Sequence, residues 1–177
     1  MAFQYAPQGN IPIPDLEFKE NIKLNSAETA LIIVDMQNDF IKPGGSLVVP
    51  AAMATLPHIQ GLLMKGRRHG VKVAYTRDTQ FSDDPEFKIW PQHCLKGTWG
   101  WQIVEELAPL DTEMIIEKNR YDGFFGSALD YYLSRVWKVK NLIITGTVAN
   151  ICVLHTAASA ALRWFHIIMP ANSVSAL

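Results

Sequence analysis

The hydrophobic positions of this chain fall into five short runs, separated by longer stretches in which apolar and polar residues mix. Each run is largely continuous rather than alternating and is rich in β-branched residues, as in strands that are buried on both faces of a parallel sheet. The runs cover residues 30–34, 71–76, 113–117, 142–145 and 165–169. We predict a strand at each of them.

Several of the intervening stretches carry apolar residues three and four positions apart, which is the period of an amphipathic helix. This pattern predicts helices over residues 51–69, 101–107 and 127–136, and a fourth that begins near Asn150. Gly70 follows the first of these helices, in the position that a C-cap glycine takes. Strands that alternate with helices indicate an α/β fold, in which a single domain forms a doubly wound, mainly parallel, Rossmann-like β-sheet with helices on both faces.

Both ends of the chain depart from this alternation. Residues 1–25 contain three prolines and no sustained period, so we expect an extended N-terminal arm ahead of a domain over residues 26–177. No covering helix follows the last predicted strand. We expect either that a C-terminal helix of the domain is missing or that a neighbouring subunit covers that face.

The composition excludes several classes of function. The chain has 177 residues, of which 49% are hydrophobic and 19% charged, as in one soluble globular domain. A net charge of −1 and the lack of a basic run argue against nucleic acid or an anionic membrane as a partner. No apolar stretch approaches the ~20 residues of a membrane span. With two cysteines and no secretory signal, we expect a cytoplasmic protein with reduced thiols.

Three functional side chains fall at the ends of predicted strands. Asp35 ends the first strand, Lys118 ends the third, and Cys152 follows the fourth in the first turn of a helix. Because parallel sheets bind ligands at the carboxyl ends of their strands, we expect these side chains to converge. A helix N-terminus and a nearby cation lower the pKa of a thiol, and a carboxylate can accept its proton. The pattern predicts nucleophilic catalysis by Cys152 with Asp35 as base and Lys118 as the supporting cation.

The segments around these residues carry a resemblance to a known family. They read VDMQNDF around Asp35, EKNRYDGFFGS around Lys118 and GTVANICVLHTA around Cys152, and a fourth block, WPQHCLKGTWG, covers residues 90–100. In this order the blocks resemble those of the isochorismatase-like cysteine hydrolases, which include nicotinamidases, N-carbamoylsarcosine amidohydrolases and ureidoacrylate amidohydrolases. The resemblance implies the isochorismatase-like hydrolase fold, an Asp-Lys-Cys triad, a small-molecule amide substrate and a homo-oligomer, either a dimer or a tetramer.

The resemblance also implies a reaction. Cys152 would attack the carbonyl carbon of an amide or carbamoyl compound, release an amine, and leave a thioester that water hydrolyses. A cis peptide bond between Thr147 and Val148 would direct the backbone N–H of Val148, together with that of Cys152, at the carbonyl oxygen as an oxyanion hole.

The metal site of the nicotinamidases is only partly matched. Asp78 and His93 stand at two positions that the resemblance assigns to metal ligands, but Gln80 and Glu86 stand where it implies histidines. We expect that no cofactor is required, and that Asp78, Glu86 and His93 hold a divalent ion weakly at most. Without strong imidazole ligands, nicotinamide is a weaker expectation as the substrate, whereas the thiol chemistry is unaffected.

Four aromatic residues are candidates for a substrate pocket: Phe40, Trp90, Phe124 and Phe125. Packing in the core or at an interface is an equally open interpretation for each of them. The alternatives for the whole chain are a nicotinamidase proper with a weak metal site, and a non-catalytic ligand-binding or scaffold member of the fold.

Overall fold

The centre of the sheet is strand β1, Thr29–Val34, whose six residues are all buried. This computed structural model describes residues 18–177, so most of the arm expected over residues 1–25 lies outside the described residues. The described part of that arm, residues 18–25, forms no helix or strand, and most of it is exposed.

Parallel strands flank β1 on both sides. β2 (Lys72–Asp78) and β3 (Met114–Lys118) follow on one side, and β4 (Asn141–Thr147) and β5 (His166–Ile168) follow on the other. The strand order is β3-β2-β1-β4-β5, and the short strand β6, Val174–Ser175, pairs with the carboxyl end of β4. The five predicted strands are thus confirmed. The strand order reverses between β1 and β4, where open α/β sheets bind ligands.

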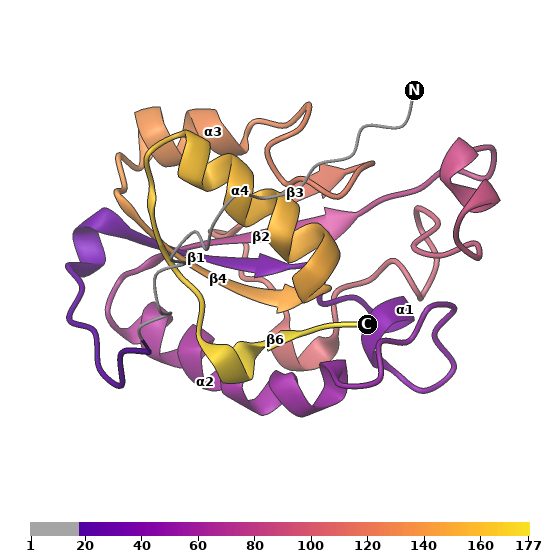
Figure 1. Ribbon diagram of the computed structural model, residues 1–177, viewed down its shortest axis with the longest axis horizontal. Helices are drawn as coiled ribbons and strands as arrows, with labels where there is room; N and C mark the ends of the chain where they lie inside the picture. Colours follow the sequence, from indigo (N-terminus) through magenta and orange to yellow (C-terminus); the bar gives the residue numbers. More distant parts are fainter. Residues whose placement is uncertain (1–17) are drawn as a thin grey trace, which may run out of the picture.

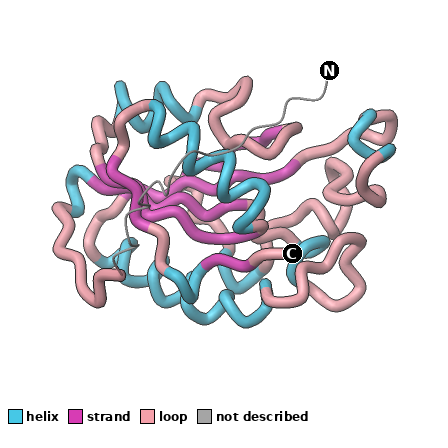
Figure 2. The backbone as a smooth tube through the Cα atoms, viewed as in Figure 1, coloured by secondary structure: helices cyan, strands magenta, loops and turns pink. Residues whose placement is uncertain are grey.

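Helices cover both faces of this sheet, as the sequence predicts. Figure 1 shows α2 (Ala52–Arg68) below the sheet, with α4 (Leu154–Leu162) and α3 (Leu129–Tyr131) above it. The same layers are visible in the tube of Figure 2, where the strands lie between the two sets of helices. The fold is therefore a mainly parallel α/β sandwich with one hydrophobic core on each face of the sheet.

Strand β1 contributes to both cores because successive side chains of a strand point to opposite faces. Leu31 and Ile33 belong to the core on the α2 side. Ala30, Ile32 and Val34 belong to the core under α3 and α4. A continuous apolar run is therefore what this position in the sheet requires.

Helix α2 forms almost over the range that its pattern predicts. Leu56, Ile59 and Leu63 face the core, which anchors the helix to the sheet. Pro57 lies inside the helix without ending it. Gly70 follows with a φ of 69°, a left-handed conformation that glycine adopts without a steric penalty.

The other helical segments are shorter than predicted. The stretch over 127–136 forms α3 and then a π-helical turn, Tyr132–Val136, and the stretch over 101–107 forms only a 3-10 turn, Glu105–Leu107. The helix expected near Asn150 begins as a π-helical turn, Ala149–Val153, and continues as α4. The remaining short helices, which the sequence pattern did not predict, are α1 (Asn38–Ile41) and the 3-10 turns Ser26–Glu28, Pro85–Lys88 and Ala171–Ser173.

Gly146 lies inside β4 rather than ending it. Its φ is 112°, and a Cβ atom at this position would lie 2.1 Å from the carbonyl oxygen of Val34. Only glycine therefore lets β4 pair this closely with β1 and continue to Thr147. This close approach brings the turn after β4 up against the end of β1.

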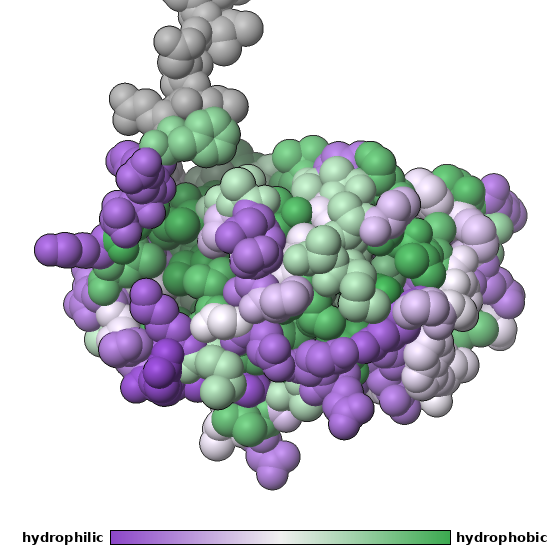
Figure 3. Space-filling view, turned by 90° about the horizontal axis from the view of Figure 1, so that it is seen from below, coloured by the Kyte–Doolittle hydropathy of each residue, from purple (hydrophilic) through white to green (hydrophobic). Residues whose placement is uncertain are grey.

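Figure 3 shows the α2 side of the molecule, where hydrophobic and hydrophilic side chains are interspersed. Two methionines of α2, Met53 and Met64, are 41% and 54% exposed there. None of the helices within residues 18–177 has the length and hydrophobicity needed to cross a membrane.

Candidate active site

The three strand-end residues lie together at the carboxyl edge of the sheet. The Lys118 ammonium is 2.7 Å from Asp35 Oδ2 and 3.7 Å from Cys152 Sγ. Asp35 is fully buried, and Lys118 and Cys152 are 2% and 7% exposed. The structure therefore brings an acid, a cation and a thiol within reach of one another, in a place from which most water is excluded.

The carboxylate of Asp35 is held at both oxygens. Its backbone turns at the end of β1 with a φ of 49°, and its N–H donates to the carbonyl oxygen of Thr76. The Thr76 hydroxyl donates to Oδ1 at 2.7 Å, while Lys118 binds Oδ2. Neighbouring strands β1 and β2 thus fix the orientation of this group.

A second carboxylate, Asp78, shares the lysine. Lys118 Nζ lies 3.2 Å from Asp78 Oδ1, and His93 Nε2 lies 3.2 Å from Asp78 Oδ2. The amide of Gln80 lies 3.3 Å from each of these oxygens. Burial alone would raise the pKa of Asp78, but Lys118 and His93 outweigh it and lower that pKa to about 2.

The same charges keep Lys118 protonated. Burial alone would lower the pKa of its ammonium group, but the carboxylates of Asp35 and Asp78 outweigh burial and raise that pKa well above its ordinary value. For Asp35, burial raises the pKa and Asp78 raises it further, against the opposing effect of Lys118. A carboxyl group with a raised pKa is a stronger base than an ordinary aspartate.

The thiol does not behave as the sequence predicts. Burial raises the pKa of Cys152 well above its ordinary value, Lys118 offsets only part of this, and Asp35 and Asp78 add to it. The prediction of a lowered pKa is therefore wrong for the free protein. The reason is that the helix N-terminus and the lysine act on a sulfur that is also desolvated and lies beside two carboxylates.

Backbone donors lie beside the sulfur. The expected cis peptide bond is present between Thr147 and Val148. The Val148 carbonyl accepts from the N–H groups of Ile151 and Val153. Cys152 lies in the first turn of the π-helical segment, where N–H groups have no partner within the helix.

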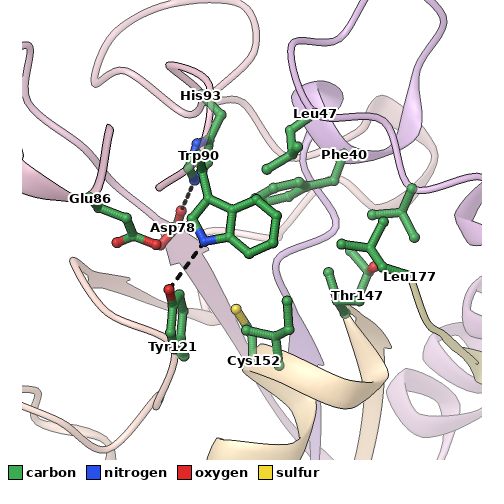
Figure 4. A pocket seen from close by; sticks show the side chains of 13 residues that line it. Phe40, Leu47, Asp78, Glu86, Trp90, His93, Tyr121, Thr147, Cys152 and Leu177 are labelled. Carbon is green, nitrogen blue, oxygen red and sulfur yellow. Dashed lines mark hydrogen bonds and ion pairs between the residues drawn. The ribbon is translucent and has the colours of Figure 1, made fainter. Parts of the chain in front are cut away.

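A pocket opens above the sulfur, with an apolar side and a polar side. Figure 4 shows Phe40 and Leu47 on one side of the Trp90 indole, and Glu86, Asp78 and Tyr121 on the other. The pocket is lined by Phe40, Leu47, Val49, Asp78, Glu86, Trp90, His93, Tyr121, Thr147, Val148, Ile151, Cys152 and Leu177.

Two of the four aromatic candidates do not line this pocket. Phe40 and Trp90 line it, but Phe124 packs under α4 against Phe165, with ring centroids 6.4 Å apart. Phe125 is 67% exposed. Phe124 and Phe125 lie in a turn after β3 that packs Phe124 into the core on the α4 side, which a list of aromatic residues does not reveal.

Comparisons with known proteins agree with this site and fold. The chain matches the Isochorismatase domain over residues 29–177. It belongs to the isochorismatase family. It is 31% identical to an N-carbamoylsarcosine amidase from an Arthrobacter species over 82% of this chain and 58% of the relative. It is also 31% identical to the ureidoacrylate amidohydrolase RutB of Rhizobium rhizogenes, and it spans 65% of that relative's length.

Solved structures of the family share the fold. An N-carbamoylsarcosine amidase from Thermoplasma acidophilum superposes with a TM-score of 0.79 at 37% identity, over 85% of each chain. The nicotinamidase PncA of Bacillus subtilis superposes with a TM-score of 0.78 at 30% identity, over 84% of this chain and 87% of that one. This isochorismatase-family chain thus has the α/β architecture of both.

The donor atoms near Asp78 do not suit a metal ion. Both ring nitrogens of His93 have partners, since Nδ1 lies 2.7 Å from the carbonyl oxygen of Pro91 and Nε2 faces Asp78. The Gln80 amide, a hydrogen-bond donor, lies between the carboxylates of Asp78 and Glu86. Over residues 18–177 no group of three or more His, Cys, Asp and Glu side chains is arranged to hold a metal. Weak binding of a divalent ion by Asp78, Glu86 and His93 stays a prediction, and the hydrogen bonds that these side chains already form do not favour it.

Several residues of the site were not singled out from the sequence. Thr76 orients Asp35, and Tyr121 accepts a hydrogen bond from the Trp90 indole at 3.2 Å. Asp78 contacts Lys118 as well as His93, although it was considered only as a metal ligand. Thr76 and Asp78 are two apart on β2 and so share a face, which is the one signal in the sequence that relates them.

Proposed function

We propose that this chain is a cysteine-dependent hydrolase that cleaves the C–N bond of a small amide or carbamoyl compound. The observation that carries the proposal is the Lys118 ammonium, which lies within 3.7 Å of both a buried carboxylate, Asp35, and the sulfur of Cys152 at the base of a pocket. An acid, a cation and a thiol in contact are the parts that nucleophilic catalysis at a carbonyl requires.

The reaction follows from these positions. Asp35 accepts the thiol proton while Sγ of Cys152 bonds to the carbonyl carbon, and the N–H groups of Val148 and Cys152 stabilise the negative oxygen. The intermediate then breaks its C–N bond, and the leaving amine takes the proton from Asp35. A thioester remains on Cys152. Water, deprotonated by Asp35, attacks the thioester and releases the acid and the thiol.

The raised pKa values fit this scheme. A buried Cys152 stays a neutral thiol in the free enzyme, so it needs a base at the moment of attack. Asp35, whose pKa is raised by burial, is better matched to that proton than a solvated aspartate. Lys118 stays charged throughout and balances the negative charge as it moves between oxygen and sulfur.

The relatives support the same class of reaction. Those named above are an amidase, an amidohydrolase and a nicotinamidase, which all act on C–N bonds of small molecules. The identities near 30% leave the substrate open. A cytoplasmic location and a homo-oligomer remain predictions, the second of which light scattering on the purified protein tests directly.

The test combines turnover with trapping of the intermediate. Purified protein is assayed for ammonia release from nicotinamide, pyrazinamide, N-carbamoylsarcosine and ureidoacrylate, and the acid-quenched reaction is examined by intact-protein mass spectrometry. We expect ammonia release and a mass increase equal to the acyl group on the peptide that contains Cys152.

The chain offers a matched control for this test. Cys94, the other cysteine, is buried, and its backbone N–H donates to Asp39 rather than to a reacting group, so Cys94→Ala should retain turnover and acylation whereas Cys152→Ala loses both. Turnover that survives in Cys152→Ala would contradict the thiol mechanism. A protein that binds these amides without ever being acylated would instead be the ligand-binding member considered above.

A further inference from the structure

The charges around the pocket are unbalanced on the side that a substrate meets. The charged side chains that line it are Asp78, Glu86 and His93. Within residues 18–177 no lysine or arginine lines this pocket. Two of the three lining groups are carboxylates, and the third, His93, has its Nε2 3.2 Å from Asp78, so no lysine or arginine of the described part of the chain offsets the charge of Glu86 from inside the pocket.

Lys118 cannot supply the missing positive charge to a ligand. An ammonium group has three N–H donors. Those of Lys118 already face Asp35 at 2.7 Å, Asp78 at 3.2 Å and Cys152 Sγ at 3.7 Å. Its side chain is fully buried beneath the pocket. A substrate carboxylate would therefore have to displace one of these partners to reach it.

Arg120 lies on the outside of the pocket wall. Its guanidinium is 3.1 Å from Asp84 and 3.7 Å from Glu86, and 42% of its side chain is exposed. It does not line the pocket. Arg120 therefore contacts Glu86 from outside the pocket lining.

Glu86 retains capacity to accept a hydrogen bond from a ligand. Its side chain is 6% exposed, and its contacts to Gln80 and Arg120 are long, at 3.5 and 3.7 Å, and reach the same oxygen, Oε2. The Tyr121 hydroxyl lies beside it as a neutral donor. A carboxylate accepts about four hydrogen bonds, so Glu86 has capacity for a further donor from a ligand.

We propose that the pocket selects neutral or cationic amides over amides that carry a carboxylate, and that Glu86 is the specificity-determining residue. The inference rests on the proposed amidohydrolase function. An N–H or ammonium group of the substrate donates to Glu86, while the apolar side formed by Phe40 and Leu47 holds its carbon skeleton. A carboxylate in the same position meets Glu86 and Asp78 in a site with little water, where like charges repel strongly.

The first test measures charge selection at the sulfur without requiring turnover. Three methanethiosulfonate reagents are compared for their rate of reaction with Cys152: the cationic aminoethyl, the neutral methyl and the anionic sulfonatoethyl compound. Each rate is divided by that of 2-mercaptoethanol, and the labelled cysteine is identified by mass spectrometry. We expect the cationic reagent to be favoured over the anionic one by about tenfold or more.

The variants assign this selection to one residue. Glu86→Gln keeps the shape and removes the charge, so the cation-to-anion ratio should fall about threefold or more. Glu105→Gln removes a charge from an exposed glutamate away from the pocket and should leave the ratio unchanged. A ratio near one, a ratio unaffected by Glu86→Gln, or a Cys152 that none of the reagents reaches would overturn the inference.

The second test compares substrates that share one reacting carboxamide. 3-(Aminomethyl)benzamide, benzamide and 3-carbamoylbenzoate carry a cationic substituent, no substituent and an anionic substituent at the same ring position, and ammonia release gives kcat/KM for each. The kcat/KM of the first two compounds should exceed that of 3-carbamoylbenzoate by about tenfold or more, and this ratio should be smaller in Glu86→Gln. Turnover without this order refutes the inference and leaves the hydrolase proposal standing. If none of the three compounds is hydrolysed, their dissociation constants are measured with the Cys152→Ala variant. The same order of affinities supports the inference and any other order refutes it, independently of the hydrolase proposal.

Discussion

Replacing Lys118 with methionine tests the electrostatic arrangement of the site through stability. The substitution keeps the length of the side chain and removes the one cation that contacts both Asp35 and Asp78. Asp35 is fully buried, and Asp78 is 4% exposed, so neither carboxylate gains water in exchange. Two buried negative charges are left facing each other, with His93 and the Gln80 amide as the remaining partners of Asp78.

Breaking a buried ion pair by removing one partner costs about 3–5 kcal/mol. For a chain of this size we expect a melting temperature about 6–20 °C lower than that of the wild type. The loss of unfolding free energy must also depend on pH. Without Lys118 the pKa of each carboxyl group rises, so the folded variant binds more protons than the unfolded chain above pH ~4.

The sign of that dependence is fixed. A folded-state pKa above the unfolded value means that stability is lost as the pH rises toward the folded pKa. In the wild type the pKa of Asp78 is lowered to about 2, so its contribution is complete above pH ~4 and is lost only as the pH falls below that. The difference in unfolding free energy between Lys118→Met and the wild type should therefore be about 1–3 kcal/mol larger at pH 8 than at pH 5.

Urea denaturation of both proteins at pH 5 and pH 8, followed by circular dichroism, measures these differences. The control is Lys96→Met. Lys96 also forms an ion pair, with Glu117, but 47% of its side chain is exposed, so its loss should cost below about 1 kcal/mol at either pH. A loss in Lys118→Met that is as small as the control, or that is equal at the two pH values, would refute the electrostatic reasoning.

Three further predictions follow from the same structure. Asp35→Asn removes the proposed base and should lower kcat in the ammonia-release assay by about a hundredfold to ten-thousandfold with little change in KM; a loss below tenfold would contradict its role. Dialysis against EDTA should leave kcat/KM and the melting temperature unchanged, and a loss that zinc or manganese restores would show that a metal does bind. Gly146→Ala should destabilise the fold by about 3 kcal/mol or more in urea, because its Cβ would meet Val34. Gly61→Ala, in open space on α2, should instead stabilise it by about 0.5–1 kcal/mol, and equal effects of the two would be inconsistent with the packing.

The strands, their parallel arrangement and the residues at their ends could be predicted from the sequence alone. Continuous β-branched runs belong to doubly buried strands, and a parallel sheet gathers the carboxyl ends of its strands at one edge. Asp35, Lys118 and Cys152 could therefore be placed together without coordinates. The spacing of residue types along the chain carries this information, because strand and helix formation depends on neighbours a few residues apart.

The tertiary structure alone decided the properties that depend on burial and on contacts between distant segments. The pKa of Cys152 rises because its sulfur is desolvated and because β1 and β2 bring two carboxylates beside it, against the effects of Lys118 and of its helix position. Glu86 faces the pocket while Phe124 does not, because the loops that carry them fold independently of any periodic pattern. Desolvation and Coulomb energies are set by distances across the fold, and no spacing along the chain encodes them.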